Sequence, residues 1–596
     1  MRKNALGIVL SIAASCVTPA YAADQSATKQ SSPAAQLHAL FDAAWEQDLR
    51  DDPRGASQLG DSRFNALWAD YSPEALASRN RSDAATLQSA SRIDASQLDA
   101  ADQLNRELFM RLYRNRLDQY RFNAQLRPLD QLNYSGGILT ASETAEVIDF
   151  ATIKDYDDWI ARLRSMDRYV DQTIALLRAG IEQRNTQPRV VVDRVAKQLQ
   201  AQLVDDPTQS PFYAPFNRFA DTVATADRQR LASAAQQAIR ATVVPAFRRL
   251  QVFVDKEYLP ASRATVGIWD TPGGADFYRN RVQWFTTTTL SPQEIHAIGL
   301  KEVERIHADM LKIIAQVGFK GSFGEFLTYL RTDPKFRYRN ANDLLQAYMV
   351  MAKRIDPLLP EYFGKLPRTP YGVRAIPAAN APDTTTAYYQ PSSADGRRPG
   401  YYYVNLYLPE ERPIYEIPVL TTHEAVPGHH LQGALAKEMG ELPKFRRDFE
   451  ATAYVEGWGL YAESLGDEMG LYANPYDKFG QLTYEMWRAV RLVIDTGMHE
   501  KHWTREQAVE FFKANAAKSE LDIGNEVDRY IAWPGQATAY KVGELKIQEL
   551  RRRATAALGE KFDRREFHDT VLASGAVPLD VLERNVDTWI ALRQRS

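Results

Sequence analysis

Apolar residues recur at helical spacing through most of the first half of the chain. Leu104, Leu108 and Leu112 follow one another four residues apart, and the same spacing recurs over residues 191–203. Polar and charged residues fill the positions between them, which is the pattern of helices with one buried face. We therefore predict an N-terminal helical region over residues 37–290.

A strong helix start follows this region. Ser291 is a favourable N-terminal cap, Pro292 suits the first helical position, and Glu294 stands at the third. These residues form a capping box, and the apolar periodicity behind them continues to about Gln316. A second helix is predicted over residues 342–358.

The pattern then changes to short runs of β-branched and aromatic residues. These runs cover residues 371–377, 386–390 and 401–408, and Pro, Gly, Asn and Asp separate them. They predict a small antiparallel sheet. Helical periodicity resumes at Ile417 and continues almost to the C-terminus. We therefore expect a mainly α fold with one small antiparallel β-sheet, placed inside a second region, residues 291–596.

The composition agrees with a large globular protein. The chain has 596 residues, of which 44% are hydrophobic and 25% charged, so it can bury a substantial core. Its formal net charge is -3, from 73 Lys and Arg against 76 Asp and Glu. No basic field is available to hold a nucleic-acid backbone, and we expect no nucleic-acid partner.

The N-terminus has the three parts of a secretory signal. Arg2 and Lys3 precede an apolar run over residues 5–17, and an A-x-A sequence follows. This arrangement predicts a signal peptide, residues 1–22, and then a flexible leader, residues 23–36.

Cys16 is the single cysteine of the chain and lies inside this signal. Cleavage after Ala22 would leave no thiol, which excludes disulfides, zinc–thiolate sites and cysteine nucleophiles. Alternatively, residues 13–16 loosely resemble a bacterial lipobox, and Cys16 would then carry a lipid anchor. No other stretch reaches the roughly 18 apolar residues of a transmembrane helix. We expect a periplasmic or secreted protein, either freely soluble or tethered by lipid.

A cluster of histidines indicates where the chemistry lies. Zinc hydrolases commonly place two histidines at i and i+4 of one helix, with a glutamate beside the first as the base. Here Glu424 follows His423, but Pro427 occupies position i+4. On a regular helix, His429 would lie ~120° away, and His430 would return to the same face ~10 Å along the axis. Neither histidine fits an unbroken helix.

Pro427 itself resolves this conflict. It lacks the N–H that would bond to the His423 carbonyl, and its ring clashes there, so the helix must bulge or break. Gly428 tolerates the backbone angles that follow. A bulge of two residues would bring His429 to the usual place of the second metal ligand. His430 remains the alternative ligand.

A third ligand is expected on a following helix. Glu456 stands in a Glu-Gly-Trp-Gly segment whose glycines allow close approach to the first helix. Glu463 lies two turns further on the same face, so it could support a ligand or bind a substrate amine. Two histidines and one glutamate leave a fourth position open, as in a catalytic zinc site.

Residues further along offer a group to stabilise an oxyanion. Tyr540 is the first choice for this catalytic role, with Tyr530 or His499 as alternatives. Asp495 and His499 stand at i and i+4 on one helix and could pair. Packing in the core, or a ladder of surface ion pairs that includes Arg488, would explain the same residues without catalysis.

These motifs resemble a known bacterial family. The string 423–432, with its Pro-Gly insertion, is similar to the signature of domain of unknown function 885, and the segment 456–459 resembles the third-ligand segment of gluzincin aminopeptidases. The likeness extends over nearly all of the mature chain. Members of the family are similar to the helical zincins of the thimet oligopeptidase and angiotensin-converting class. The resemblance implies a deep channel between helical halves and hydrolysis of peptides.

Taken together, the sequence predicts an exported zinc metallopeptidase that acts on short peptides. Glu424 would deprotonate the zinc-bound water, and Tyr540 would help stabilise the oxyanion. The strand 401–408 is expected at the edge of the sheet, where an extended peptide substrate could add as a further strand. Two alternatives remain: a non-catalytic, metal-dependent envelope binding protein, and a zinc amidase that acts on cell-wall peptides.

Overall fold

The computed structural model describes most of the chain after the predicted signal. The signal peptide, Cys16, most of the leader and residues 133–136 lie outside the described residues. The described residues are 32–132, 137–378, 381, 385–393, 398–447 and 449–595.

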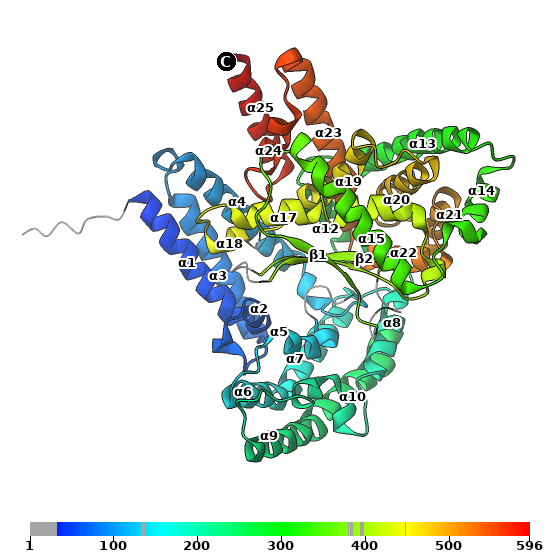
Figure 1. Ribbon diagram of the computed structural model, residues 1–596. Helices are drawn as coiled ribbons and strands as arrows, with labels where there is room; N and C mark the ends of the chain where they lie inside the picture. Colours follow the sequence, from blue (N-terminus) through cyan, green and yellow to red (C-terminus); the bar gives the residue numbers. More distant parts are fainter. Residues whose placement is uncertain are drawn as a thin grey trace, which may run out of the picture.

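Helices make up nearly all of the N-terminal part, as the sequence predicts (Figure 1). Caps fix several starts; for example, the Ser32 side chain accepts from the Ala35 N–H in front of Pro33. Two short π-helical segments interrupt the run near its end, at Ile239–Val243 and Val254–Tyr258. The helices are α1 Pro33–Asp51, α2 Pro53–Gln58, α3 Pro73–Arg92, α4 Ala100–Arg121, α5 Thr144–Val147, α6 Ile153–Arg164, α7 Met166–Glu182, α8 Arg189–Gln200, α9 Thr225–Ala238, α10 Val244–Phe253, α11 Leu259–Ala261 and α12 Gly274–Thr286.

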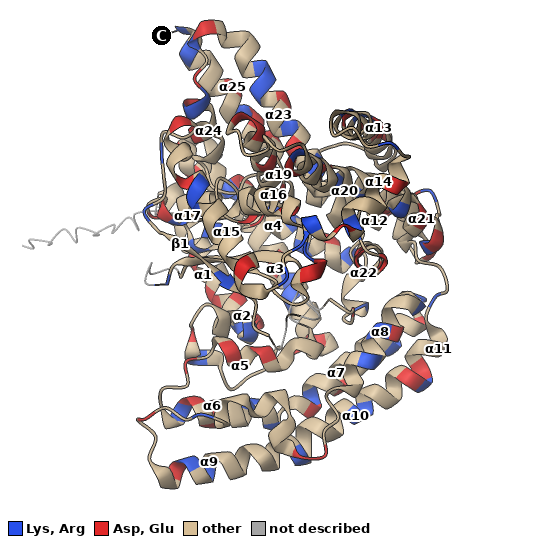
Figure 2. Ribbon diagram, turned by 45° about the vertical axis from the view of Figure 1, so that its right-hand side comes forward, with Lys and Arg blue, Asp and Glu red and all other residues tan. Residues whose placement is uncertain are grey.

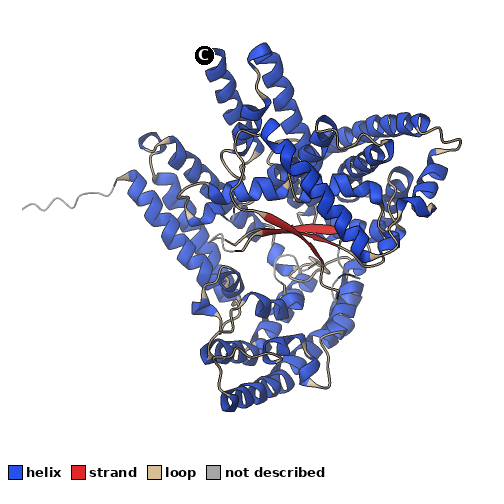
Figure 3. Cartoon of the chain, in the orientation of Figure 1, coloured by secondary structure: helices blue, strands red, loops and turns tan. Residues whose placement is uncertain are grey.

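The remainder is also helical apart from three strands (Figure 3). The helices are α13 Pro292–Gln316, α14 Phe323–Thr332, α15 Ala341–Ile355, α16 Ile417–Glu424, α17 His429–Glu438, α18 Lys444–Arg447, α19 Thr452–Glu468, α20 Pro475–His499, α21 Arg505–Asn515, α22 Glu520–Ala532, α23 Ala539–Leu558, α24 Arg564–Leu572 and α25 Leu579–Arg595. The strands are β1 Tyr371–Ala375, β2 Ala387–Gln390 and β3 Gly400–Val404.

The helix starts predicted from local signals are confirmed. Ser291 and Glu294 form the predicted capping box, and α13 ends at Gln316. The helix predicted over residues 342–358 is α15, whose last predicted residues belong instead to a 3₁₀ turn, Asp356–Glu361.

The small sheet is present, but it is mixed rather than wholly antiparallel. The strand order is β1-β3-β2, with β1 parallel and β2 antiparallel to β3. The prediction that the strand 401–408 lies at the edge of the sheet is therefore wrong, because β3 pairs with a strand on each side. Local residue patterns do not determine this order, since strand pairing is a long-range property. Among the described strands, β1 and β2 are the two edges of the sheet.

Packing joins the N-terminal helices to the second half of the chain. Phe41 of α1 and Phe109 of α4 contact Phe445 of α18, with ring centroids 4.9 and 5.1 Å away. Arg111 of α4 pairs with Asp580 of α25. The helices from α6 to α10 form a separate hydrophobic core. The predicted domain boundaries at residues 37, 291 and 596 stay a prediction.

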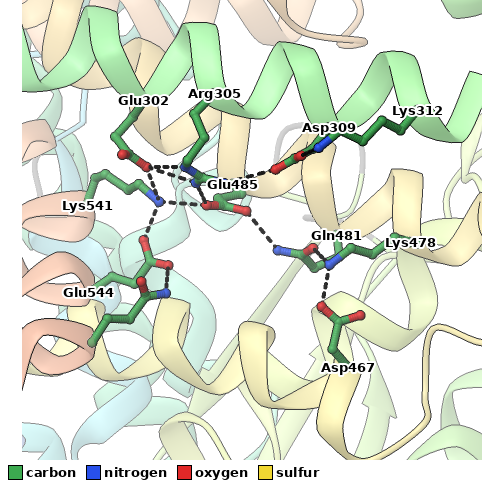
Figure 4. A network of polar contacts seen from close by, with 11 residues as sticks. Glu302, Arg305, Asp309, Lys312, Asp467, Lys478, Gln481, Glu485, Lys541 and Glu544 are labelled. Carbon is green, nitrogen blue, oxygen red and sulfur yellow. Dashed lines mark hydrogen bonds and ion pairs between the residues drawn. The ribbon is translucent and has the colours of Figure 1, made fainter. Parts of the chain in front are cut away.

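An ion-pair network connects three helices (Figure 4). The Lys541 ammonium of α23 is fully buried and lies 3.3, 2.8 and 2.6 Å from Glu302, Glu485 and Glu544. Arg305 of α13 pairs with two of these carboxylates. The network therefore joins α13, α20 and α23 through the cations of Lys541 and Arg305.

Charges of both signs alternate over the helices in the view of Figure 2, in keeping with the small net charge. None of the described helices combines the length and the apolar character needed to cross a membrane.

Candidate functional site

The predicted break in the histidine segment is confirmed. Helix α16 ends at Glu424, and α17 begins only at His429. Ala425 leaves the helical conformation, with φ -99 and ψ -105. The His430 N–H donates to the Ala425 carbonyl at 3.0 Å, which closes the turn between the two helices. Pro427, which the sequence analysis identified as the cause, lies inside this turn.

Gly428 is required by the tightness of the turn. A Cβ at this position would lie 1.9 Å from the carbonyl oxygen of His423 and 2.4 Å from that of Thr422. The Trp458 indole of α19 donates to the Pro427 carbonyl at 2.9 Å. The turn is thus held from a neighbouring helix, and the backbone at residue 428 has no room for a side chain.

The turn brings two histidines and one glutamate together. His423, His429 and Glu456 each offer a donor atom, and these atoms lie within 4.8 Å of one another. Glu456 Oε2 is 3.8 Å from His423 Nε2 and 3.6 Å from His429 Nε2. The two imidazole rings are nearly perpendicular, at 85°, with centroids 4.7 Å apart. This is the donor group that the preferred sequence interpretation named.

Glu463 supports the first of these histidines. Its Oε1 lies 2.8 Å from His423 Nδ1, and its side chain is buried. Burial raises the pKa of Glu463 to about 8, against the opposing charge of Arg488. When ionised, Glu463 favours the His423 tautomer with its proton on Nδ1, so Nε2 presents a lone pair to the donor group. The same oxygen is 3.5 Å from Arg488. Glu463 thus takes the supporting role that was one of its two predicted roles, and its alternative role in binding a substrate amine stays a prediction.

Burial and charge set the protonation of the donors. Burial, followed by the charge of His429, lowers the pKa of His423 to about 3. Burial alone would raise the pKa of Glu456, but His429, His423 and Arg491 outweigh it and lower that pKa to about 2. Burial alone would lower the pKa of His429, but the hydrogen bond to Glu456 and the charge of that residue outweigh it and raise the pKa. A neutral imidazole at His423 and an ionised carboxylate at Glu456 are forms that bind a metal.

Glycines set the approach of α19 to its neighbours. A Cβ at Gly459 would lie 2.8 Å from Cε1 of His423. Gly457 faces the other way, where its Cβ would lie 2.5 Å from the carbonyl carbon of Gly543 in α23. Both glycines were predicted to allow close approach to the first helix. Only Gly459 does so, because it faces His423 of α16, whereas Gly457 faces α23.

The donor group opens onto a cavity of about 1610 Å³. Its walls come from both halves of the chain: Trp45 and Leu49 belong to α1, and Leu132 follows α4. The edge strand β2 forms another wall, including Tyr388 and Tyr389. A ligand in this cavity could contact the donor group and the strand edge together.

Glu424 and Tyr540 both line the cavity. Glu424 lies outside the donor group, and its charge raises the pKa of His423 and His429 against the burial that lowers it. The Arg529 guanidinium donates to the Tyr540 hydroxyl oxygen at 3.2 Å. Because arginine only donates, the Tyr540 proton is left for another acceptor.

Other candidates from the sequence lie elsewhere. His430 is outside the donor group; its Nδ1 is 3.0 Å from the Tyr389 hydroxyl, since the turn points the two neighbouring histidines in different directions. His499 accepts from the Ile268 N–H at 3.0 Å, and its Nε2 is 2.9 Å from the Tyr530 carbonyl oxygen. Neither ring nitrogen of His499 is thus available to a substrate.

Tyr530 and Asp495 are likewise engaged within the core. The Tyr530 hydroxyl donates to Glu526, and its side chain is buried away from the cavity. Asp495 accepts from the Tyr278 hydroxyl at 2.6 Å and from the Gly535 N–H at 3.1 Å, rather than pairing with His499 as predicted. Tyr540 is therefore the tyrosine, among those predicted, that faces the candidate site.

Three arginines beside the site were not assigned a role from the sequence. Arg488 and Arg491 of α20 and Arg529 of α22 line the same cavity. For Arg488 and Arg491 the usable signal was their setting, because arginines within a helix that is buried along most of its length need a partner or a function.

The fold and site define a mainly helical protein with a small mixed sheet and a cavity that carries a two-histidine, one-glutamate group. The chain belongs to the family described as bacterial protein of unknown function (DUF885), whose pattern matches residues 53–586.

Two solved structures resemble this one. "The putative lipoprotein from Colwellia psychrerythraea" is 31% identical, with a TM-score of 0.88 over 94% of this chain and 100% of that one. "A putative lipoprotein of unknown function from Shewanella oneidensis" is 17% identical and similar in fold, with a TM-score of 0.73 over 93% of this chain and 99% of that one. No curated protein matches the chain.

Proposed function

We propose that the protein is a zinc-dependent metallopeptidase that hydrolyses short peptides. The observation that carries the proposal is the group of His423, His429 and Glu456 at the wall of a large cavity. The distances of 3.6 and 3.8 Å from Glu456 to the two imidazoles are close to the roughly 3.3 Å edge of a tetrahedral zinc site. Nitrogen and carboxylate donors without thiol suit this metal, and three protein ligands leave one position open.

A bound zinc would supply a Lewis acid for the peptide carbonyl and would lower the pKa of water. Glu424 accepts a proton from the attacking water on a carboxylate oxygen. It returns this proton to the amine nitrogen as the C–N bond breaks. The Tyr540 hydroxyl donates a hydrogen bond to the oxygen that gains negative charge.

Substrate binding would use the edge of the sheet. Strand β2, not β3 as first expected, combines a free edge among the described strands with a place in the cavity wall. An extended peptide could pair with it through main-chain hydrogen bonds. The enclosure by α1 and the helices around the site favours short peptides over folded proteins.

Glu424→Gln tests the mechanism directly. The amide keeps the shape of the side chain but cannot accept the proton, so we expect zinc to stay bound while hydrolysis falls by roughly two to four orders of magnitude. Elemental analysis and digestion of a peptide library measure the two effects. Glu441→Gln, an exposed change outside the cavity, is the matched control.

The results separate the alternatives. If Glu424→Gln hydrolysed peptides at the wild-type rate, Glu424 would not be the base. A wild-type protein that binds zinc but cleaves nothing would be a metal-dependent binding protein. Cleavage confined to cell-wall amides would identify an amidase. Purified protein without zinc, and without uptake on addition, would refute the metal site itself.

We also propose that the protein is exported and associated with the cell envelope. The N-terminal sequence has the form of a secretory signal, and both similar structures carry the name lipoprotein. This likeness favours a lipid anchor at Cys16 over cleavage after Ala22. The mass of the mature N-terminal peptide distinguishes the two, and Cys16→Ala should release an anchored protein from the membrane fraction.

A further inference from the structure

Three arginines form a basic wall beside the donor group. Arg488 and Arg491 are one turn apart on α20, and Arg529 stands on α22; all three line the cavity. Arg488 and Arg491 are only 5% and 3% exposed. Buried arginines need compensating charge, so the partners of these side chains decide whether the wall is complete.

Two carboxylates pair directly with the arginines of this wall. Glu526 serves two arginines, 3.0 Å from Arg491 and 3.4 Å from Arg529. Burial alone would raise the pKa of Glu526, but the charges of these arginines lower it to about 2. Arg488 shares Glu463 with the ring of His423. Three guanidinium groups therefore share two paired carboxylates, one of which also supports a candidate metal ligand. The nearby Glu424 and Glu456 of the same cavity are the proposed base and a metal donor.

Donor atoms on the same arginines are unused. Arg488 Nε, Arg491 Nη1 and Arg529 Nε are buried and have no hydrogen-bond partner within the part of the chain that the structure describes. A buried N–H without an acceptor is unfavourable, so these atoms indicate a missing acceptor that carries negative charge. The shared carboxylates and the unused donors together indicate an anionic ligand.

Aromatic rings hold the central guanidinium in place. The Arg491 guanidinium carbon lies 4.7 Å from the Trp487 ring centroid and 4.4 Å from that of Tyr540. Tyr540 in turn accepts from Arg529. A guanidinium fixed between rings loses little freedom when it binds a planar carboxylate. The residue proposed to contact the reacting carbonyl oxygen is thus packed directly against the basic wall.

We propose that Arg488, Arg491 and Arg529 bind the free α-carboxylate of a short peptide, so that hydrolysis releases a residue or short fragment from the C-terminus. The inference rests on the proposed peptidase function, which it deepens. A chain end supplies a carboxylate without requiring the peptide to continue beyond the buried wall. An acidic side chain carries the same chemistry, and the experiment below distinguishes the two sources.

Binding can be measured without hydrolysis. The probes are acetyl-tetra-alanine with a free carboxylate, the same peptide as its C-terminal amide, and an amide with glutamate as its last residue. Calorimetric titration uses the zinc-loaded Glu424→Gln protein. We expect the free acid to bind roughly 10- to 100-fold more tightly than either amide, the effect of about one hydrogen bond between charged groups.

Variants test the arginines themselves. Arg529→Gln should reduce the preference for the free acid, and Arg491→Lys should retain part of it, because lysine keeps the charge but loses the planar, two-pronged donor. Arg447 also lines the cavity but is exposed. Arg447→Gln removes the same charge and should leave the preference unchanged, which separates specific binding from the general field of the cavity.

Kinetics of the wild type give a second measurement. Amidation of the C-terminus should raise KM more than it lowers kcat, whereas N-terminal acetylation should change neither strongly. Equal binding and equal cleavage of acid and amide would overturn the arginine site and leave the peptidase intact. Tight binding of the glutamate amide would overturn the assignment to the chain end. Preferred binding of the acid without any cleavage by the wild type would support the arginine site and refute the peptidase.

Discussion

The two adjacent histidines of the turn offer a sharp test of the metal site. His429 belongs to the donor group, whereas His430 contacts Tyr389 and lies outside it. Structural zinc sites with four ligands bind with about 10–16 kcal/mol, or roughly 3–4 kcal/mol for each ligand. His429→Ala should therefore weaken zinc binding by roughly two to three orders of magnitude.

His430→Ala is the matched control, because it removes the same side chain one position further along. It loses a hydrogen bond worth about 1 kcal/mol of stability but no donor to the metal. Competition with a chromogenic chelator gives the zinc affinity of each variant, and thermal unfolding reports their stability. The reasoning fails if His430→Ala loses as much zinc affinity as His429→Ala, or if His429→Ala binds zinc like the wild type.

Two further predictions concern the close contact at Gly459 and the buried ion pairs of Lys541. Gly459→Ala should weaken zinc binding in the same chelator assay, because its Cβ would lie 2.8 Å from the His423 ring, whereas Gly433→Ala, with no contact nearer than 3.8 Å, should not; equal affinities would contradict this account. Lys541→Met should lower the free energy of unfolding by about 3–5 kcal/mol, since it leaves three buried carboxylates without their ammonium. Lys312→Met, at the exposed end of the same network, should cost less than about 1 kcal/mol in urea unfolding, and similar losses for both would refute the difference.

Elements with local signals were predictable from the sequence. The capping box at Ser291 needs only residues within one turn, and it starts α13 where expected. The break after Glu424 follows from the missing N–H of Pro427, which is also a local property. The sheet differs, because the order of its strands depends on contacts between distant residues. Nothing in residues 371–408 alone places β3 between β1 and β2.

The site shows the same limit. The choice between His429 and His430 could not be settled by spacing, since it depends on the backbone angles of the turn that Gly428 closes. The buried position of His499 is also a tertiary fact, because both its ring partners are backbone groups from distant segments. The role of Arg529 depends on α22 lying beside α20, which no local pattern in either helix indicates.

The helix α19 shows why the spacing of its residues is informative. Glu456 and Glu463 are seven residues apart and so lie on one face. The first offers a donor to the metal group, and the second fixes the ring of His423 from behind. Between them, Gly459 removes the side chain that would collide with that ring. One face of α19 thus carries the donor Glu456 and the supporting Glu463, and Gly459 leaves room for the His423 ring.

The partners of the three arginines allow carboxylate binding to be separated from metal binding. Glu463 connects His423 to Arg488, so the donor group and the basic wall share one buried carboxylate. Arg529, by contrast, contacts Glu526 and Tyr540 rather than the histidines of the donor group. Changes at Arg529 should therefore alter the preference for a free carboxylate without loss of metal. Changes at Glu463 should alter both together, because the two parts of the site meet at that side chain.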